Sequence, residues 1–275
     1  MIHKTISIWE ETNYLYESTE DFVPTLDTYI LDGDKKRPCV LICPGGAYGF
    51  TSPREAEPIA MQFNAAGFHA FVVYYSVAPK RHPQPLMDLS RAMCIIRHRS
   101  DEWNVDPDKI AVCGFSAGGH LAASLGVHWN KPYLEEVSGI EIGMNRPNAL
   151  ILSYPVISSG DYSHEGSIKN LLGDDLTKPH LLEEMSLELN ISEWTPPTFL
   201  WHTFDDDAVP VENTLLFAQG LRKKNIPFEL HIYPHGPHGL SLANDETDDG
   251  NMGSYPHVAT WMSLCIEWLE GLKFA

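Results

Sequence analysis

Short apolar runs that alternate with helix-like stretches are the feature that most constrains the fold of this chain. The apolar runs have the length of strands: PCVLIC (38–43), FHAFVVYYS (68–76), IAVCGFS (110–116), NALILSYPV (148–156), TPPTFLWHT (195–203) and PFELHIYP (227–234). Apolar residues recur at helical spacing in the stretches 53–67, 85–103, 117–129, 211–225 and 254–272. Because parallel strands require crossover helices, this pattern predicts a doubly wound, mostly parallel sheet with helices on both faces. We expect a single α/β domain over residues 1–275.

Further elements lie before and within this pattern. TISIW (5–9) and LDTYILDG (26–33) read as early strands that can form an antiparallel edge pair. The polar segment DPDK (106–109) is predicted to be a turn that leads into the strand after it. Residues 157–195 break the alternation and are predicted to form a small cap-like insertion above the sheet. Ligands in such sheets bind at the carboxyl ends of the strands, so the functional residues are expected there.

A candidate nucleophile lies at the end of one of these strands. Residues 114–118, GFSAG, match the pattern G-x-S-x-G, with an apolar strand before Ser116 and a helix-like stretch after it. A nucleophile elbow needs this strand–turn–helix context, because its serine lies on a strained turn. The alternative is a tight turn with an incidental serine, and the glycines alone do not decide between the two.

A serine hydroxyl needs a base, and the base needs an orienting acid. Candidate bases are His235 and His238 in HIYPHGPHGLSL (231–242); each precedes a glycine, so spacing does not separate them. Candidate acids are the three consecutive aspartates of HTFDDDAVP (202–210), namely Asp205, Asp206 and Asp207. At most one of three adjacent carboxylates can point inward. The order Ser, Asp, His is the order that α/β-hydrolases use.

Acyl transfer also needs backbone N–H donors for the oxyanion. The residue after the nucleophile, Ala117, is one candidate, and Gly46 and Ala47 in PGGAYGF (44–50) are others. The rival interpretation is a glycine-rich phosphate loop. It is disfavoured, because the chain has neither G-x-x-x-x-G-K-[ST] nor G-x-G-x-x-G there.

From about residue 38 onward the chain resembles the α/β-hydrolase superfamily, in particular the esterase/lipase group that includes acetyl-xylan esterases and related carbohydrate esterases. The resemblance lies in four segments: CPGGAYGF, VDPDKIAVCGFSAGGHLAASLG, LSYPVIS and HTFDDDAVPVENTLLFAQGLRKKNIPFELHIYPHGPHGLSLA. The N-terminal stretch carries no matching motif. The resemblance implies a serine carboxylesterase that hydrolyses short-chain, acetyl-type esters through an acyl-serine.

The same resemblance implies roles for individual residues. Ser116 corresponds to the nucleophile, Asp206 to the acid in H-x-x-x-D-x-x-V-P, and His238 to the base in HGL. By the same correspondence, the N–H groups of Gly46, Ala47 and Ala117 form the oxyanion hole. The loop departs from the H-G-G-G form of many lipases, because it has Pro44 in place of His and Ala47 in place of the third Gly.

Two aromatic residues, Tyr48 and Trp201, are candidates for lining the acyl or alcohol pocket, with core packing as the alternative.

The charge and residue composition argue against several classes of binding partner. The chain has 37 acidic and 19 basic residues, a net charge of −18, which disfavours binding to nucleic acid or an anionic membrane. No apolar run approaches the ~20 residues of a membrane span. The polar start MIHKTISIWEETNY lacks a signal sequence, so we expect a cytoplasmic protein. Five cysteines without C-x-x-C pairs and scattered histidines indicate neither disulfides nor a metal site. No cofactor is expected, and the oligomeric state is left open.

Two other functions are compatible with these residues. A serine peptidase of the prolyl-peptidase type shares the architecture, but such enzymes usually carry a large additional domain. A non-catalytic hydrolase-fold protein would bind a ligand or partner, but such proteins typically lose a member of the triad.

Overall fold

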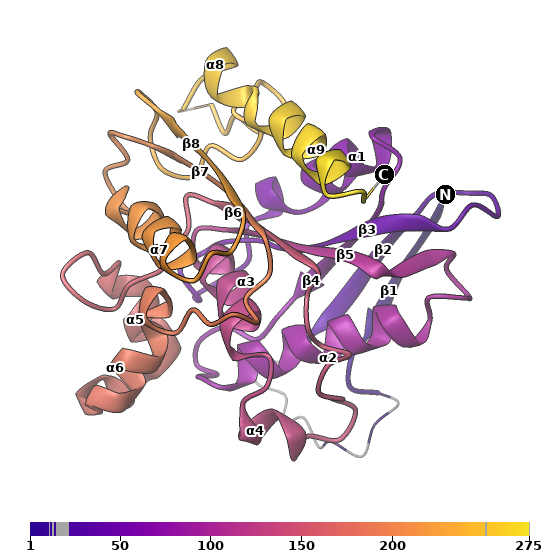
Figure 1. The fold of residues 1–275 in the computed structure, drawn as a ribbon, viewed down its shortest axis with the longest axis horizontal. Coiled ribbons are helices and arrows are strands. Elements are labelled where there is room, and N and C mark those ends of the chain that lie inside the picture. The colour runs from indigo at the N-terminus through magenta and orange to yellow at the C-terminus, as the bar shows by residue number, and fades with distance from the viewer. Residues whose placement is uncertain (11, 13, 15–21, 251, 275) are drawn as a thin grey trace.

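In the computed structural model, residues 1–10, 12, 14, 22–250 and 252–274 are described. Eight strands form one sheet in the order β1-β2-β4-β3-β5-β6-β7-β8 (Figure 1). Their bounds are β1 Ile2–Ser7, β2 Thr25–Ile30, β3 Arg37–Cys43, β4 His69–Tyr74, β5 Val105–Phe115, β6 Ala149–Ser153, β7 Thr198–Thr203 and β8 Phe228–Tyr233. Strands β3 to β8 pair in parallel, whereas β2 is antiparallel to both β1 and β4. The predicted mostly parallel sheet and its antiparallel edge pair are confirmed.

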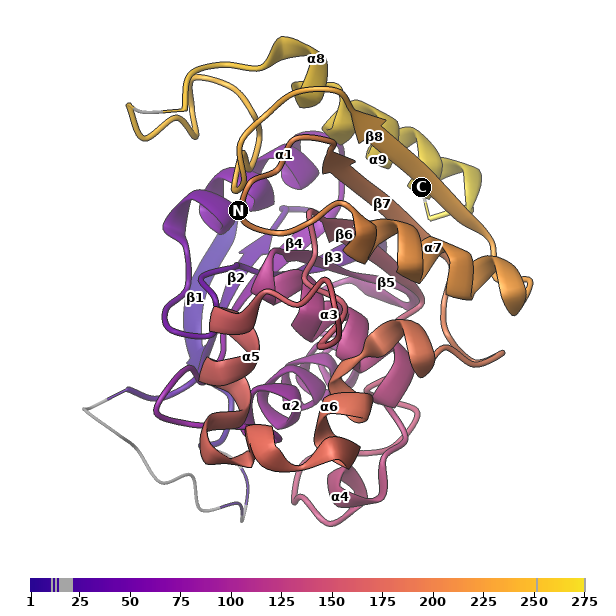
Figure 2. The same ribbon diagram turned by 90° about the vertical axis from the view of Figure 1, so that its left-hand side faces the viewer.

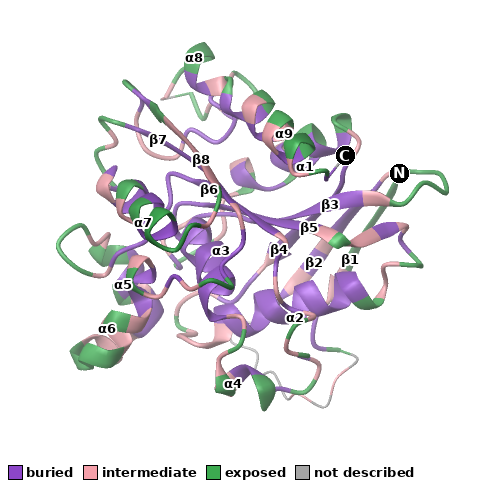
Figure 3. Cartoon of the chain, viewed as in Figure 1, coloured by how far each residue is buried: buried purple, intermediate pink, exposed green. Residues whose placement is uncertain are grey.

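Helices cover both faces of the sheet, as expected. Helices α1 (Glu57–Ala65) and α9 (Trp261–Gly271) lie on one face, and α2 (Gln84–His98), α3 (Ala117–His128) and α7 (Glu212–Lys223) lie on the other (Figure 1). Each face has its own hydrophobic core, because parallel strands alternate their apolar side chains between the two layers. Every residue of α3 is buried, and Figure 3 shows this helix and the central strands enclosed by the more exposed outer helices.

The segment predicted as a cap folds into short helices. It contains α5 (Glu165–Leu172), a 3₁₀ turn at Gly173–Thr177, α6 (Pro179–Met185) and a second 3₁₀ turn at Leu187–Leu189. Figure 2 shows α5 and α6 beside α3. Hydrogen bonds from His120 and His128 of α3 to the carbonyl oxygens of Met185 and Glu184 hold α6 in this place.

Two sequence predictions were wrong at element boundaries. DPDK is not a turn, because β5 starts at Val105 and its first residue pairs with Arg37 before a bulge shifts the register. The predicted helix 254–272 is divided into α8 (Pro256–Ala259) and α9, with Thr260 between them. The strand runs through a polar segment, and apolar spacing continues through the helix break, so hydrophobic periodicity alone reveals neither boundary.

Two further features concern the chain as a whole. Each of the five cysteines is buried with a free thiol, as expected of small core residues. Among the residues that the structure describes, no helix is long and apolar enough to cross a membrane.

The sheet order also locates the site. From β3 the chain continues to β4 on one side, and β5 then lies on the other side of β3. This reversal of direction is a topological switch point, where the loops after neighbouring strands diverge and leave a crevice. The loop after β3 and the turn after β5 meet there.

Candidate active site

Ser116 lies in the sharp turn between β5 and α3. Its backbone has φ 53° and ψ −119°, a conformation that L-residues rarely adopt and that costs on the order of 1–3 kcal/mol. Its neighbours Gly114 and Gly118 permit the turn, because a Cβ on Gly114 would lie 2.2 Å from the carbonyl oxygen of Gly118. The geometry is that of a nucleophile elbow, with the serine presented above the sheet.

Gly118 also allows α3 to pack against the loop after β3. A Cβ at this position would lie 2.1 Å from the carbonyl oxygen of Cys43 and 2.5 Å from that of Pro44. We expect Gly118→Ala to destabilise the fold by about 3 kcal/mol and to displace this loop, because both clashing atoms belong to the backbone at the end of β3 and not to a flexible side chain. Urea unfolding measures the loss. Gly271→Ala is the control, since nothing lies within 4 Å of its Cβ position, and equal midpoints for both variants would contradict this close packing.

A continuous chain of hydrogen bonds links three of the candidate residues. Nε2 of His238 lies 2.8 Å from Oγ of Ser116, and its Nδ1 lies 2.7 Å from Oδ2 of Asp206. Oδ1 of Asp206 accepts hydrogen bonds from the backbone N–H groups of Ala208 and Val209. The carboxylate is thus held at the end of β7 with Oδ2 directed at the imidazole.

Asp206 is anchored by a second histidine. Nε2 of His202 lies 3.2 Å from Oδ2 of Asp206, while its Nδ1 pairs with Oγ1 of Thr214. Burial by itself raises the pKa of Asp206, but the hydrogen bonds from His202 and His238 outweigh burial and hold this pKa below its ordinary value. The carboxylate of Asp206 is therefore ionised at neutral pH. His202 is fully buried on β7, and the sequence pattern alone does not predict this role for it.

The alternative acid and base form a separate pair. Oδ2 of Asp205 lies 3.0 Å from Nδ1 of His235, and their side chains are 48% and 80% exposed. Asp207 is exposed as well. Of the three aspartates, Asp206 is thus the one that points inward, in agreement with the resemblance on which its selection depended.

The loop after β3 leaves two amide groups available. Residues 46–48 all have positive φ: 130° at Gly46, 52° at Ala47 and 55° at Tyr48. Asn170 of α5 donates to the carbonyl oxygen of Ala47 at 2.9 Å, and the N–H of Ala78 donates to that of Tyr48 at 2.7 Å. No acceptor within the described part of the chain takes the N–H of Gly46 or Ala47.

These amides lie beside the nucleophile, since a Cβ on Gly45 would be 3.0 Å from Cβ of Ser116. Ala117 is the first residue of α3, and an N–H in the first turn of a helix has no intrahelical partner. Among the described residues, no backbone acceptor takes the N–H of any of the three predicted oxyanion donors, which lie near Ser116. Such groups stabilise a developing oxyanion.

A cavity of about 250 Å³ opens beside Ser116. The residues that line it are Gly46, Ala47, Phe50, Ser52, Arg54, Glu55, Ser116, His164, His238, Gly239 and Met252. Phe50, His164 and Met252 were missed by sequence analysis. They come from a loop, from the cap-like insertion and from the segment before α8, where the sequence has no periodicity that indicates which side chains turn inward.

The prediction that Tyr48 and Trp201 line the pocket does not hold in the structure. Neither borders this cavity, and both are buried in the core. The hydroxyl of Tyr48 lies 2.8 Å from Nδ1 of His120, and Nε1 of Trp201 donates to Oγ of Ser153 at 2.8 Å. Each ring thus finds a buried partner for its polar atom away from the cavity, which is the ordinary requirement for a buried Tyr or Trp.

His164 is the residue of the cap-like insertion that lines the cavity. It precedes α5, and its Nδ1 accepts the backbone N–H of Ser167 at 3.3 Å. With Nδ1 as the acceptor, the proton of the neutral ring is assigned to Nε2. Burial, followed by the neighbouring His238, lowers the pKa of His164, so the ring stays neutral at physiological pH.

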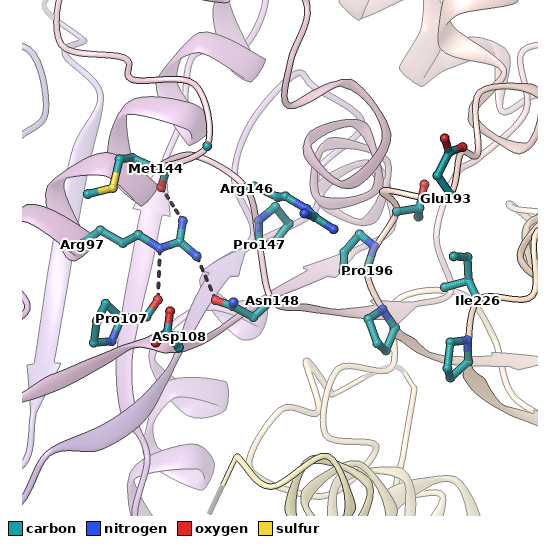
Figure 4. A pocket seen from close by; sticks show the side chains of 14 residues that line it. Arg97, Pro107, Asp108, Met144, Arg146, Pro147, Asn148, Glu193, Pro196 and Ile226 are labelled. Atoms are coloured by element: carbon teal, nitrogen blue, oxygen red, sulfur yellow. Dashed lines mark hydrogen bonds between the residues drawn. The ribbon is translucent and has the colours of Figure 1, made fainter.

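A larger cavity, of about 630 Å³, lies at the opposite end of the parallel strands from Ser116 (Figure 4). Asn148, Pro197 and Pro227 line it, and each directly precedes a strand, at its amino end. Figure 4 shows the guanidinium of Arg97 between Pro107, Met144 and Asn148, with hydrogen bonds to all three. Because these acceptors are part of the protein, Arg97 has a structural role, and this cavity lacks the nucleophile and base found beside Ser116.

Comparisons with known proteins find a family model and relatives that match much of this chain. The BD-FAE family model matches residues 26–221. Endo-1,4-beta-xylanase B of Butyrivibrio fibrisolvens is 43% identical over 256 residues, which are 90% of this chain and 39% of that protein. Acetylxylan esterase of Xylanibacter ruminicola is 33% identical over 204 residues, which are 72% of this chain and 40% of the relative. The chain thus spans about two fifths of the length of these two relatives.

Solved structures are similar over nearly the whole chain. An acetyl ester-xyloside bifunctional hydrolase from Caldicellulosiruptor lactoaceticus has a TM-score of 0.87 and 44% identity, and the match covers 98% of this chain and 97% of that one. The carboxylesterase Cest-2923 from Lactobacillus plantarum has a TM-score of 0.82 and 25% identity, with 100% and 98% covered.

Proposed function

Because the chain belongs to the BD-FAE family of α/β-hydrolases, we propose that it is a serine carboxylesterase that removes short acyl groups, above all acetyl, from carbohydrate esters. The observation that carries the proposal is the unbroken hydrogen-bond chain from Asp206 through His238 to Ser116, next to free backbone amides. Two similar proteins, the acetylxylan esterase and the acetyl ester-xyloside hydrolase, carry names that point to this substrate class.

In the proposed reaction, Oγ of Ser116 attacks the ester carbonyl carbon while Nε2 of His238 takes its proton. Asp206 accepts the Nδ1–H of His238 and stabilises the imidazolium. The N–H groups of Gly46, Ala47 and Ala117 bind the oxyanion of the tetrahedral intermediate. His238 then protonates the leaving alcohol. Water attacks the acyl-serine by the same proton path and releases the acid.

The cavity supports a preference for small acyl groups. Its volume of about 250 Å³ is below the ~300–1,000 Å³ of typical drug-sized ligand pockets. The Nε2–H of His164 is suited to a hydroxyl or ring oxygen of a sugar on the alcohol side. The net charge of −18 favours neutral acetylated sugars over phosphorylated ones. The cytoplasmic location expected from the sequence stays a prediction.

A panel of p-nitrophenyl esters from acetate to laurate, with acetylated xylo-oligosaccharides and an acyl anilide, tests the proposal. We expect kcat/KM to be highest for acetyl and at least about 100-fold lower from octanoate upward, because each excluded methylene costs transition-state binding. Preferred cleavage of the anilide would favour the peptidase alternative, and preferred cleavage of long-chain esters would contradict the substrate class. A chain inactive on every ester would favour the non-catalytic binding protein.

A further inference from the structure

A buried carboxylate, Glu55, lies at the active site without being part of the Asp–His–Ser chain. It ends the short 3₁₀ turn Pro53–Glu55, is 4% exposed and borders the cavity beside Ser116. An ionised carboxylate removed from water without partners is strongly destabilising, so its surroundings must stabilise the charge. A Cβ on Gly45 would lie 2.8 Å from Oε2 of Glu55 and 3.0 Å from Cβ of Ser116, which places this oxygen close to the nucleophile.

Both oxygens of Glu55 accept hydrogen bonds. The backbone N–H of Gly45 donates to Oε2 at 2.7 Å, and the hydroxyl of Tyr154 donates to Oε1 at 2.6 Å. Oη of Tyr154 in turn accepts the N–H of Ser241 at 2.9 Å. Burial raises the pKa of Glu55, and the hydrogen bonds from Tyr154 and Gly45 act against burial by stabilising the carboxylate form. Two acceptor oxygens are the pattern of an ionised carboxylate.

These partners connect Glu55 to two parts of the site. Gly45 begins the loop that supplies the amides of Gly46 and Ala47. Tyr154 packs its ring edge-on against the imidazole of His238, with centroids 5.1 Å apart, and Ser241 lies three residues beyond that histidine. One carboxylate therefore joins the oxyanion loop to the loop of the base.

The titratable and charged groups around Glu55 define its electrostatic effect. They are Arg54 on the same turn, Tyr75 after β4, Cys113 on β5, Tyr154 after β6 and His238 after β8. Burial raises the pKa values of the two tyrosines and the cysteine, so these three stay neutral. The positive charges that face the carboxylate are those of Arg54 and of His238 in its protonated form.

We propose that Glu55 is a positioning residue of the esterase reaction, which fixes the oxyanion loop through Gly45 and the loop of the base through Tyr154. Its negative charge also favours the protonated form of His238 that arises when Ser116 loses its proton. This inference rests on the proposed function. It assigns to the buried carboxylate a role that is separate from that of Asp206.

The Glu55→Gln substitution keeps the size of the side chain and removes its charge. The amide group then faces either the N–H of Gly45 or the hydroxyl of Tyr154, so one donor meets another. We expect kcat for p-nitrophenyl acetate to fall about 10- to 100-fold, with KM changed by less than about threefold, since the interactions strengthen in the transition state. The fall in kcat/KM should therefore be about as large as the fall in kcat.

Matched variants separate this role from a purely structural one. Glu57→Gln makes the same change two residues later on an exposed side chain and should leave kcat and KM unchanged. Tyr154→Phe keeps both Glu55 and the ring against His238, and should lower kcat about threefold to tenfold with KM again nearly unchanged. It also provides a second test if the Gln variant does not fold, which thermal unfolding reveals.

The inference would be overturned by a folded Glu55→Gln variant with the wild-type kcat. A fall in kcat accompanied by a rise in KM of more than about threefold would also overturn it, since that result indicates a repacked cavity. Failure of the proposed function looks different, because the wild-type chain would then be inactive on esters before any substitution.

Discussion

Replacing Ser116 with alanine is expected to abolish ester hydrolysis while leaving the fold intact. The hydroxyl makes a single hydrogen bond, to His238, so its removal takes away the nucleophile and little stabilising contact. We expect kcat for p-nitrophenyl acetate to fall about 10⁵- to 10⁶-fold, with residual turnover from the oxyanion amides alone. Steady-state kinetics measure the loss, and an unchanged melting temperature shows that the protein is folded.

A serine elsewhere provides the matched control. Ser263 is exposed on α9, and Ser263→Ala should retain full activity. A fluorophosphonate probe should label the wild-type chain and the Ser263→Ala variant but not the Ser116→Ala variant. Activity of Ser116→Ala within tenfold of wild type would mean that another residue is the nucleophile and that the elbow is a structural turn.

Asp206→Asn is expected to have the next largest effect, about a 10³- to 10⁴-fold fall in kcat with KM nearly unchanged. An asparagine can keep its carbonyl oxygen on the amides of Ala208 and Val209, which directs its NH₂ group at Nδ1 of His238. That ring nitrogen must then accept, so the proton moves to Nε2 and the imidazole can no longer take the proton of Ser116. Asp205→Asn is the control, since Asp205 pairs with the exposed His235, and it should stay within about twofold of wild type.

The same substitution also has an expected effect on stability as a function of pH. Because the folded-state pKa of Asp206 lies below its unfolded value, its carboxylate stabilises the fold above about pH 4, and this contribution is lost as the pH falls through the folded-state pKa. The free energy of unfolding of the Asn variant should therefore fall less than that of wild type as the pH is lowered from 5. Urea unfolding at several pH values measures this difference, and parallel curves for the two proteins would contradict it.

Several features of the fold and site are predictable from the sequence because they depend on neighbouring residues. Strand-length apolar runs and helical periodicity predict the mostly parallel sheet, since each crossover helix lies between two strands along the chain. The elbow is predictable for the same reason: Gly114 and Gly118 flank Ser116 along the chain, and the strand and helix that define it are contiguous with it. The order of Ser116, Asp206 and His238 follows the order of the strands.

Other features were predictable only in part. The residues themselves left three aspartates and two histidines open, and resemblance to known esterases was needed to choose Asp206 and His238. The structure distinguishes them by direction, since Asp206 turns inward at the end of β7 while Asp205 and Asp207 face solvent. For Tyr48 and Trp201 the sequence left the pocket and the core as alternatives, and in the structure both are buried with partners in the core.

The sequence by itself thus determined the architecture, the elbow and the types of residue at the strand ends, because each depends on contacts between residues close along the chain. Only the tertiary structure decided which side chains face Ser116. Glu55 shows the reason: a glutamate at the start of a helix ordinarily lies in water, and its burial is stabilised by Gly45, ten residues away, and by Tyr154, 99 residues away. Such partners come together only when the sheet assembles, which no local sequence pattern encodes.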